Sequence, residues 1–500
     1  MTHVLDFPVL SLLLMSMPAA VVLIWLVPDP RKARWIALIT TLMDMLLIIL
    51  MLINFDTSAT SYQFVEQASW IPSLNVQYLV GVDGISVLFL FFTTLLFTGV
   101  ILASWNSARS QPRLYFGLLL LLESITLGIF SSMDVVLFFL FWELSLAPLY
   151  FLVSLWGVGP NRRYAAVKYT LLMLAGGIPL LFGFIMLGFG HAESINMTVP
   201  QGFAFDYPTL LQTRLPHGLE VTVFFLLLLG FLVKTPAFPF HTWLPVVTME
   251  GPAAIAALMT GLKLGAYGII RFVVPLAPTV AQEFHWLLAG LGVVGILSGA
   301  VLAVAQTNLR QMLAYSSISH VGLVLLAIAS FNLQGIQGAI FQLLNFSIVG
   351  GGLFLLTGFL HQRVGSTDII SLGGVASTAP LLASFYMLFG LASLGVPGTS
   401  GFPAEFLMLV SALKTHTGAG LAALAGVVIG AGYFLGIYRR TFFGPMTSPV
   451  IRQAIDLKPR ELLIVLVFAA FILFNGLYPM GILGFTQAAS EHWISLLPAR

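Results

Sequence analysis

The sequence has no cysteine and very few charged residues. None of its 500 residues is cysteine, and Asp, Glu, Lys and Arg together make up only 8% of the chain. Without cysteine, this chain can form no disulfide, no cysteine-ligated iron–sulfur cluster and no thiol nucleophile. Soluble domains carry about 25% charged residues, so the shortage of charge excludes an ordinary soluble fold. The net charge of +2 gives no reason to expect nucleic-acid binding.

What remains is overwhelmingly apolar. Hydrophobic residues make up 59% of the chain, and the mean hydropathy is +1.00. A membrane span needs about 20 apolar residues. The pattern predicts an all-α polytopic membrane protein, a single transmembrane domain over residues 1–500 with about 14 transmembrane helices. The expected spans are 4–27, 34–54, 83–104, 114–131, 133–156, 164–190, 220–242, 252–276, 284–305, 311–331, 335–360, 380–412, 417–440 and 460–480.

Two longer polar connections, residues 55–82 and 191–219, are predicted to form hairpins or short amphipathic pieces outside the membrane. Lysine and arginine are unevenly divided between the alternate loops. Most, such as Arg31, Arg162 and Arg439, fall in loops on one side, whereas Arg214 and Lys414 fall on the other. The positive-inside rule therefore places both termini on the outer side, because the number of crossings is even.

Two predicted spans contain internal breaks. Proline follows closely after Lys234, and a glycine- and proline-rich stretch precedes Glu405. These are the seventh and twelfth spans, and an odd offset of five places them in opposite orientations. Paired broken helices indicate two inverted five-helix repeats around a transport route. We expect N-terminal helices 1–3 in residues 1–110, the first repeat (helices 4–8) in 111–278, the second (helices 9–13) in 279–445, and helix 14 with a tail in 446–500.

Charged side chains within the spans are costly, and they usually mark an ion or proton route. Lys234 lies beside a helix break, where freed backbone groups need protein or a water-filled cavity. Glu143 lies among bulky apolar residues and could not remain ionised alone, so we expect it to pair with Lys234. Opening and closing such a pair would change how readily the lysine loses its proton. The alternative is a static pair that only neutralises charge.

Three further residues complete the predicted relay. Lys263 has no acid within one helical turn, and the small residues around it leave room for water or close packing. His320 shares a helix face with Ser316 and Ser317, and histidine titrates near neutral pH. Glu405 follows the second break as the terminal acid. The alternatives are a hydrogen-bonded structural histidine and a helix-capping glutamate.

Several other polar residues have weaker claims. Glu123 is a possible spare partner for Lys234, and His241 lies beside the first break. Asp44 is early in the chain and is expected to be peripheral. No phosphate-binding loop, dinucleotide fingerprint or metal-ligand cluster is present, so we expect neither catalysis nor a metal site in this chain.

The order of several motifs resembles the antiporter-like, proton-pumping membrane subunits of respiratory complex I, which are related to Mrp antiporter subunits. The resemblance covers about residues 75–445. It rests on Gly81-Val-Asp-Gly-Ile-Ser86, Phe141-Trp-Glu-Leu-Ser145, Lys234-Thr-Pro-Ala-Phe-Pro-Phe-His-Thr-Trp-Leu-Pro245, Gln306-Thr-Asn-Leu-Arg310, Ala314-Tyr-Ser-Ser-Ile-Ser-His320 and Gly398-Thr-Ser-Gly-Phe-Pro-Ala-Glu405.

The resemblance implies a proton route along a hydrated axis through Glu143, Lys234, Lys263, His320 and Glu405. It also implies that the chain carries no cofactor, and that flavin, iron–sulfur clusters and quinone belong to partner subunits. The partners would be neighbouring antiporter-like subunits and peripheral subunits, in a bacterial inner membrane or a thylakoid membrane. The chain would thus take part in NAD(P)H–quinone or ferredoxin–quinone oxidoreduction without redox catalysis of its own.

The sequence also departs from the family pattern. Residues 246–248 are Val-Val-Thr where the family usually has Asp-Ala-His, Asn308 replaces an acid, and Phe346 replaces a frequent histidine. We therefore expect water held by Gln342 and Asn345 to bridge His320 and Glu405. The departures favour two alternatives, a specialised paralogue in a cyanobacterial carbon-dioxide-uptake complex and a structural subunit with an inactive channel. An Mrp-type cation/proton antiporter subunit is a further alternative that does not depend on them.

Overall fold

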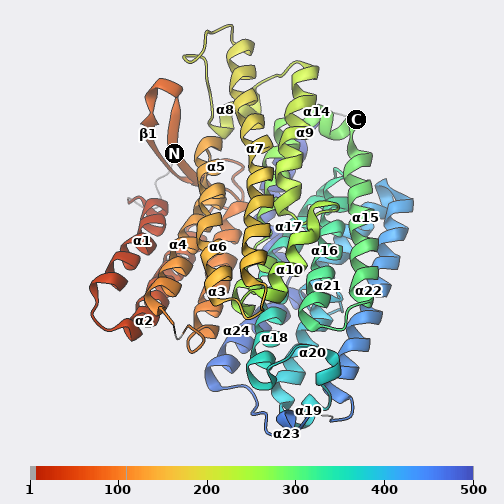
Figure 1. Cartoon of the computed structure of the whole chain (residues 1–500). Helices are drawn as coiled ribbons and strands as arrows, with labels where there is room; N and C mark the ends of the chain where they lie inside the picture. The colour runs from red at the N-terminus through yellow and green to blue at the C-terminus, as the bar shows by residue number, and fades with distance from the viewer. Residues whose placement is uncertain (1–6, 109, 447, 499–500) are drawn as a thin grey trace.

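The computed structural model describes residues 7–108, 110–446 and 448–498, and they form a bundle of long helices (Figure 1). Thirteen helices or joined helices in these ranges are long and apolar enough to span a membrane. The remaining predicted span is the interrupted pair α20 (Pro380–Ser393) and α21 (Gly401–Thr415). The predicted fold class is therefore confirmed. The first span is described from Val9, so residues 4–6 of that prediction lie outside the described ranges.

The first half of the bundle runs from α1 to α13. Its helices are α1 (Val9–Leu26), α2 (Ala33–Ile53), α3 (Ser86–Ala103), α4 (Pro112–Ser131), α5 (Val135–Leu144), α6 (Leu146–Trp156), α7 (Arg162–Ser194), α9 (His217–Lys234), α10 (Trp243–Glu250), α11 (Ala253–Gly261), α12 (Leu264–Gly268), the π-helix Ile269–Val273 and α13 (Val274–Leu276).

The second half of the bundle runs from α14 to α25. It contains α14 (Pro278–Glu283), α15 (His285–Val304), α16 (Leu309–Ile328), α17 (Leu333–Asn345), the π-helix Phe346–Gly350, α18 (Gly351–Val364), α19 (Val375–Thr378), α20, α21, α22 (Thr417–Phe443), α23 (Pro449–Arg452), α24 (Pro459–Leu477) and α25 (Met480–Ser495). The predicted tail beyond helix 14 thus contains a further helix, α25, whose Trp493 side chain donates to the Ile270 carbonyl at 2.8 Å.

The two polar connections lie at the end of the bundle that carries both marked termini (Figure 1). Strands β1 (Gln63–Ile71) and β2 (Val76–Val82) form an antiparallel hairpin in which Gln67 pairs with Leu79. The other connection contains the short helix α8 (Tyr207–Gln212), capped by the Asp206 side chain. An extramembrane hairpin and a short helical piece were both predicted from the sequence.

Both predicted helix breaks are present. The first lies between Lys234 and Trp243, where Pro236 and Pro239 cannot donate the backbone hydrogen bonds that a helix requires. The second lies between Ser393 and Gly401. Within it, Gly395 (φ +63°) and Gly398 (φ +89°) adopt left-handed conformations that side chains with a Cβ atom rarely tolerate.

Two further interruptions were not predicted. The span 252–276 was expected to be one helix, but α11 ends at Gly261 and α12 begins at Leu264. Lys263 itself lies in the gap, with φ −87° and ψ 56°. The span 133–156 is likewise divided at Ser145 into α5 and α6. The glycines Gly261 and Gly265 on either side of Lys263 are the sequence signal that a continuous helix is weak there.

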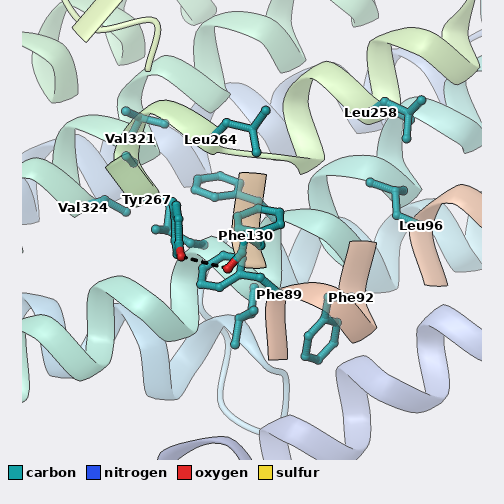
Figure 2. Packing of buried hydrophobic residues seen from close by; sticks show 14 of the residues in the cluster. Phe89, Phe92, Leu96, Phe130, Leu258, Leu264, Tyr267, Val321 and Val324 are labelled. Carbon is teal, nitrogen blue, oxygen red and sulfur yellow. Dashed lines mark hydrogen bonds between the residues drawn. The ribbon is translucent and has the colours of Figure 1, made fainter. Parts of the chain in front are cut away.

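The core lies around α3, which is almost entirely enclosed by other helices. Figure 2 shows Phe89 of α3 against Phe130 of α4 and Tyr267 of α12, with the Tyr267 hydroxyl donating to the Phe130 carbonyl at 3.3 Å. The Phe89 and Phe130 rings stack with centroids 4.9 Å apart. By contrast, α1, α2, α7 and α22 keep many apolar side chains on the outside, as helices facing lipid do.

Candidate functional site

Lys234 is the last residue of α9, and its side chain reaches into the bundle rather than to water. It is buried, and its ammonium donates to Ser145 Oγ at 2.9 Å and to the Trp142 carbonyl at 3.2 Å. The same ammonium lies 3.9 Å from the centroid of the Trp142 ring. These contacts come from the junction of α5 and α6. The helix break at Ser145 therefore builds the pocket that holds the lysine.

The expected direct ion pair between Glu143 and Lys234 is not formed. Within the described residues, no carboxylate oxygen lies within 4.0 Å of the Lys234 ammonium. Trp142 and Ser145 are one turn apart and face Lys234, whereas Glu143 lies about 100° around the helix. Its Oε1 has no hydrogen-bond partner and fills the space beside Gly177 of α7. The Glu143 carboxylate and the Lys234 ammonium therefore form no ion pair, and the ammonium is bonded to Ser145 instead.

Lys263 lies in the unpredicted gap between α11 and α12. Its side chain is buried and donates to Ser317 Oγ of α16 at 2.5 Å. The ammonium also lies 4.9 Å from the centroid of the Phe346 ring. As for Lys234, no carboxylate oxygen in the described ranges lies within 4.0 Å. Serine, rather than an acid, is thus the contact of each lysine.

His320 and Glu405 lie together at the second break. The imidazole Nε2 is 3.4 Å from Glu405 Oε1 and 2.8 Å from the Ser393 carbonyl, where α20 ends. Nδ1 is 2.8 Å from the Ser316 carbonyl. The predicted water bridge from His320 to Glu405 through Gln342 and Asn345 is therefore wrong, because the two side chains adjoin directly.

Three small cavities lie beside these residues. One of about 40 Å³ contains Lys234 with Ser145 and reaches Leu262 and Leu264, the neighbours of Lys263 in the chain. A second, of about 30 Å³, begins at Ser317 and reaches His320. The third, of about 20 Å³, lies between His320 and Glu405 and is bounded by Tyr433. Each has room for a water molecule with polar partners on its walls.

Gln342 and Asn345 line the second cavity, which lies on the Ser317 side of His320 rather than on the Glu405 side. The Asn345 amide donates to Gln342 Oε1 at 3.3 Å, and its Oδ1 accepts from Ser400 at 2.5 Å. The predicted wet face of Ser316, Ser317 and His320 is also present, since all three line this cavity. The polar groups that lead to the histidine therefore come from α16 and α17.

Two accessory residues have surroundings other than those expected. Glu123 accepts from Thr41 of α2 at 2.9 Å, so its carboxylate is turned toward the N-terminal helices and is no spare partner for Lys234. His241 stacks on Phe238 with centroids 5.7 Å apart, and its Nδ1 is buried without a hydrogen-bond partner. Within the described ranges, no group of three or more acidic, histidine or cysteine side chains could hold a metal ion.

The sequence argument missed a buried ion pair between Asp83 and Arg271. Arg271 Nη1 donates to Asp83 Oδ2 at 2.6 Å, and its guanidinium lies 4.9 Å from the rings of both Tyr62 and Tyr207. Asp83 precedes α3. Burial alone would raise its pKa, but Arg271 and the bonds from Ser86 hold the pKa below its usual range. The pair joins the start of α3 to the hairpin, α8 and the eighth span.

Replacing Asp83 with asparagine should destabilise the protein by about 3–5 kcal/mol, because Arg271 would remain buried without its counter-charge. The midpoint of thermal unfolding of the purified assembly measures this loss. A double replacement with apolar residues, Asp83→Leu with Arg271→Met, should cost less than the single change, since it removes both charges. Equal stability of the single variant and the unaltered protein would contradict a paired, buried charge.

Comparison with known proteins agrees with this geometry. Residues 132–430 match the family model described as NADH:quinone oxidoreductase/Mrp antiporter, TM. The chain is 34% identical over 497 residues to NADH-quinone oxidoreductase subunit M of Rickettsia conorii, covering 98% of this chain and 99% of the relative.

Solved structures give the same result. A chain of respiratory complex I from Thermus thermophilus with bound NADH has a TM-score of 0.87 and 30% identity, and the match covers 97% of this chain and 100% of that one. A chain of the Mrp complex from Dietzia shares the fold, with a TM-score of 0.79 at 22% identity over 97% of this chain and 51% of that one. The chain is an integral membrane protein of the NADH:quinone oxidoreductase/Mrp antiporter transmembrane family.

Proposed function

We propose that the chain is a proton-translocating membrane subunit of a multi-subunit NAD(P)H–quinone or ferredoxin–quinone oxidoreductase. The observation that carries this function is a series of buried titratable side chains with serine hydroxyls and small cavities beside them. Such groups are rare within membrane spans and mark proton routes. The higher identity to a chain of complex I than to the Mrp chain supports the redox-linked assembly over a free-standing antiporter.

The route would begin at Lys234. In the present arrangement Ser145 and the Trp142 carbonyl accept from its ammonium, and Glu143 lies apart beside Gly177. Movement of the lysine toward Glu143 would form an ion pair that favours its charged form. Return to the less polar pocket of Ser145 and Trp142 would favour release of the proton. Glu143 is half-buried, so a neighbouring subunit could act on it directly.

The middle of the route would pass through Lys263 and Ser317. Water in the first cavity would reach from Lys234 to the residues flanking Lys263. Lys263 donates to Ser317 Oγ, and the serine hydroxyl can pass its own proton on to water in the second cavity. Gln342 and Asn345 would orient that water toward His320.

The last step would run from His320 to Glu405. Their 3.4 Å separation is short enough for transfer after a small approach or through one water. Phe346, which stands where relatives often have histidine, lies with its ring centroid 6.2 Å from that of His320. It lines the second cavity without separating His320 from Glu405. The departure at residue 346 therefore leaves the proposed terminal pair in contact.

The same proposal assigns the remaining roles outside this chain. Flavin, iron–sulfur clusters and quinone would be held by partner subunits, and their redox reaction would act on this chain through its neighbours. Both termini would lie on the outer, periplasmic or lumenal, side of a bacterial inner membrane or thylakoid membrane. The division into helices 1–3, two repeats and a C-terminal segment, at residues 110, 278 and 445, belongs to this proposal as well.

Replacing Lys234 with alanine should strongly reduce proton pumping by the assembled complex, by about tenfold or more, because the route loses its first proton carrier. Acidification by complexes in sealed vesicles, normalised to quinone reduction, measures the effect. Lys414→Ala is the matched control, since Lys414 is exposed and contacts only Gln334. Unchanged pumping in an assembled Lys234→Ala complex would contradict the proposed role.

The alternative assembly is an Mrp-type cation/proton antiporter, which the family description also names and whose solved structure shares the fold. Purification of the chain with its native partners separates the two. We expect flavin and iron–sulfur absorbance in the purified complex. A complex without redox cofactors that exchanges sodium for protons would instead identify the antiporter, while leaving the internal route as described.

A further inference from the structure

Two buried carboxylates lie outside the proposed route. Asp44 of α2 and Glu123 of α4 are both completely buried, and each lies near the middle of its helix. Ser16 of α1 donates to Asp44 at 2.8 Å and 2.9 Å, and Thr41 donates to Glu123 at 2.9 Å. Helices α1, α2 and α4 pack together at the N-terminal edge of the bundle (Figure 1). The two acids therefore lie at mid-membrane depth.

The two acids lie on the same side of α2. Thr41 and Asp44 are one helical turn apart, so the hydroxyl that contacts Glu123 and the Asp44 carboxyl share a face. The Thr41 contact therefore brings the Glu123 carboxylate to the face of α2 that carries Asp44. Two fully buried carboxylates on one face cannot both remain ionised without a compensating cation, because desolvation and mutual repulsion add.

No basic side chain on the surrounding helices supplies that cation. Besides the two acids, the charged residues of α1, α2, α3 and α4 are Arg34 and Arg113, and Tyr115 is also titratable. Arg34 and Arg113 lie in the first turns of their helices. Arg113 donates to the carbonyls of residues 27 and 28, and Arg34 to that of Trp105, while Tyr115 bonds to Ser104. All three are thus engaged at the helix ends, away from the acids.

Unpaired polar atoms mark the place that a ligand would occupy. Glu123 Oε1 is buried and has no hydrogen-bond partner. Thr94 of α3 lies beside the same carboxylate, and its buried hydroxyl also makes no well-formed hydrogen bond. Buried polar groups without well-formed hydrogen bonds are rare and costly, so these two mark the place where a protonated Glu123 carboxyl would bond to Thr94.

We propose that Asp44 and Glu123 form a second proton-binding site, in which one of the two carboxyls holds a proton at mid-membrane depth. A proton on Glu123 Oε1 makes that oxygen a donor and gives it the Thr94 hydroxyl as acceptor. The Ser16 and Thr41 hydroxyls then stabilise the carboxylate oxygens that remain unprotonated. A proton bound at Glu123 gives hydrogen-bond partners to Glu123 Oε1 and the Thr94 hydroxyl. It also removes the repulsion between the two carboxylates, so no further ligand is needed.

The site lies one helix away from Lys234. Leu122 and Thr126 of α4 line the cavity that contains the lysine, whereas Glu123, on the adjoining face, turns to α2. The acid pair and Lys234 therefore lie on different faces of α4. The inference does not rest on the proposed pumping function, because it follows from the acids and their surroundings alone.

A lipophilic carbodiimide tests the site in the intact complex, because this reagent modifies protonated carboxyls in apolar surroundings. The native complex in membranes is treated, and the peptides containing Asp44 and Glu123 are examined by mass spectrometry. We expect modification of one or both, at least several-fold above that of Glu220, and falling as the pH is raised. Glu220 is the matched control, since it is buried but accepts from two backbone amides.

The same experiment distinguishes a proton from a metal cation. Modification should be unaffected when sodium ions are added at constant pH. Protection by sodium would overturn the proposal and assign a sodium site to the same oxygens. Absence of modification at both acids, in a sample where Glu143 is modified, would also overturn it, because the reagent would then have reached a membrane carboxyl without finding a proton on this pair.

Discussion

Replacing Lys263 with alanine should leave the complex assembled and abolish proton pumping through this chain. Lys263 lies between Leu262 and Leu264, which line the first cavity, and its ammonium donates to Ser317, which lines the second. Alanine would remove the proton carrier and leave an apolar gap between the two. A positioned side chain that transfers protons raises the rate of the transfer by about 10²–10⁴-fold. The rate of proton flow through this route should therefore fall by at least about 10²-fold.

The measurement is the number of protons pumped per quinone reduced, in vesicles containing the purified complex. Native electrophoresis and the amount of bound flavin check assembly. Ser317→Ala is an informative companion, since it keeps the charge but removes the hydroxyl contact, and we expect an intermediate loss. Normal assembly of Lys263→Ala with unaltered proton stoichiometry would instead favour a structural subunit with an inactive channel.

Replacing Glu405 with glutamine should reduce pumping by a similar factor, while quinone reduction is affected less. Glutamine keeps the size of the side chain but cannot take up a proton, so His320 would have no acceptor beyond it. The loss should therefore appear as fewer protons per quinone rather than as failed assembly. Proton transfer at the His320–Glu405 contact is thus tested separately from the packing of the break.

Vesicle acidification at several external pH values measures this second loss. Glu491→Gln is the matched control, because Glu491 is exposed on α25 and its nearest partner is Gln487 one turn away. Glu405→Asp should restore only part of the activity, since the shorter side chain increases the distance from His320. Full pumping in the Glu405→Gln complex would show that protons leave by another path.

The helix breaks beside Lys234 and Glu405 could be predicted because proline and glycine act locally. Pro236 and Pro239 remove backbone donors wherever they stand, and glycines at 395 and 398 permit positive φ angles. The gap at Lys263 was missed for the opposite reason. No proline lies in the gap, the flanking Gly261 and Gly265 are tolerated within helices, and the surrounding residues are apolar enough to be read as a single helix.

The pairing of side chains was harder to predict than their burial. That Glu143 and Lys234 lie in the membrane follows from the sequence, but their separation depends on which face of α5 meets α9. The contact between His320 and Glu405 likewise depends on how the chain folds back between α20 and α21. The Asp83–Arg271 pair joins residues 188 positions apart, and no local pattern links them.

One feature of the breaks affects how such a protein responds to mutation. The Lys234 ammonium donates to the Trp142 carbonyl in the last turn of α5, and His320 Nε2 contacts the Ser393 carbonyl at the end of α20. Both acceptors are main-chain atoms, present whatever side chain the residue carries. A genetic screen that replaces neighbouring side chains would leave these two contacts in place and would score many such positions as tolerant. The prolines and glycines that end the helices would score as sensitive, although none of them carries a proton.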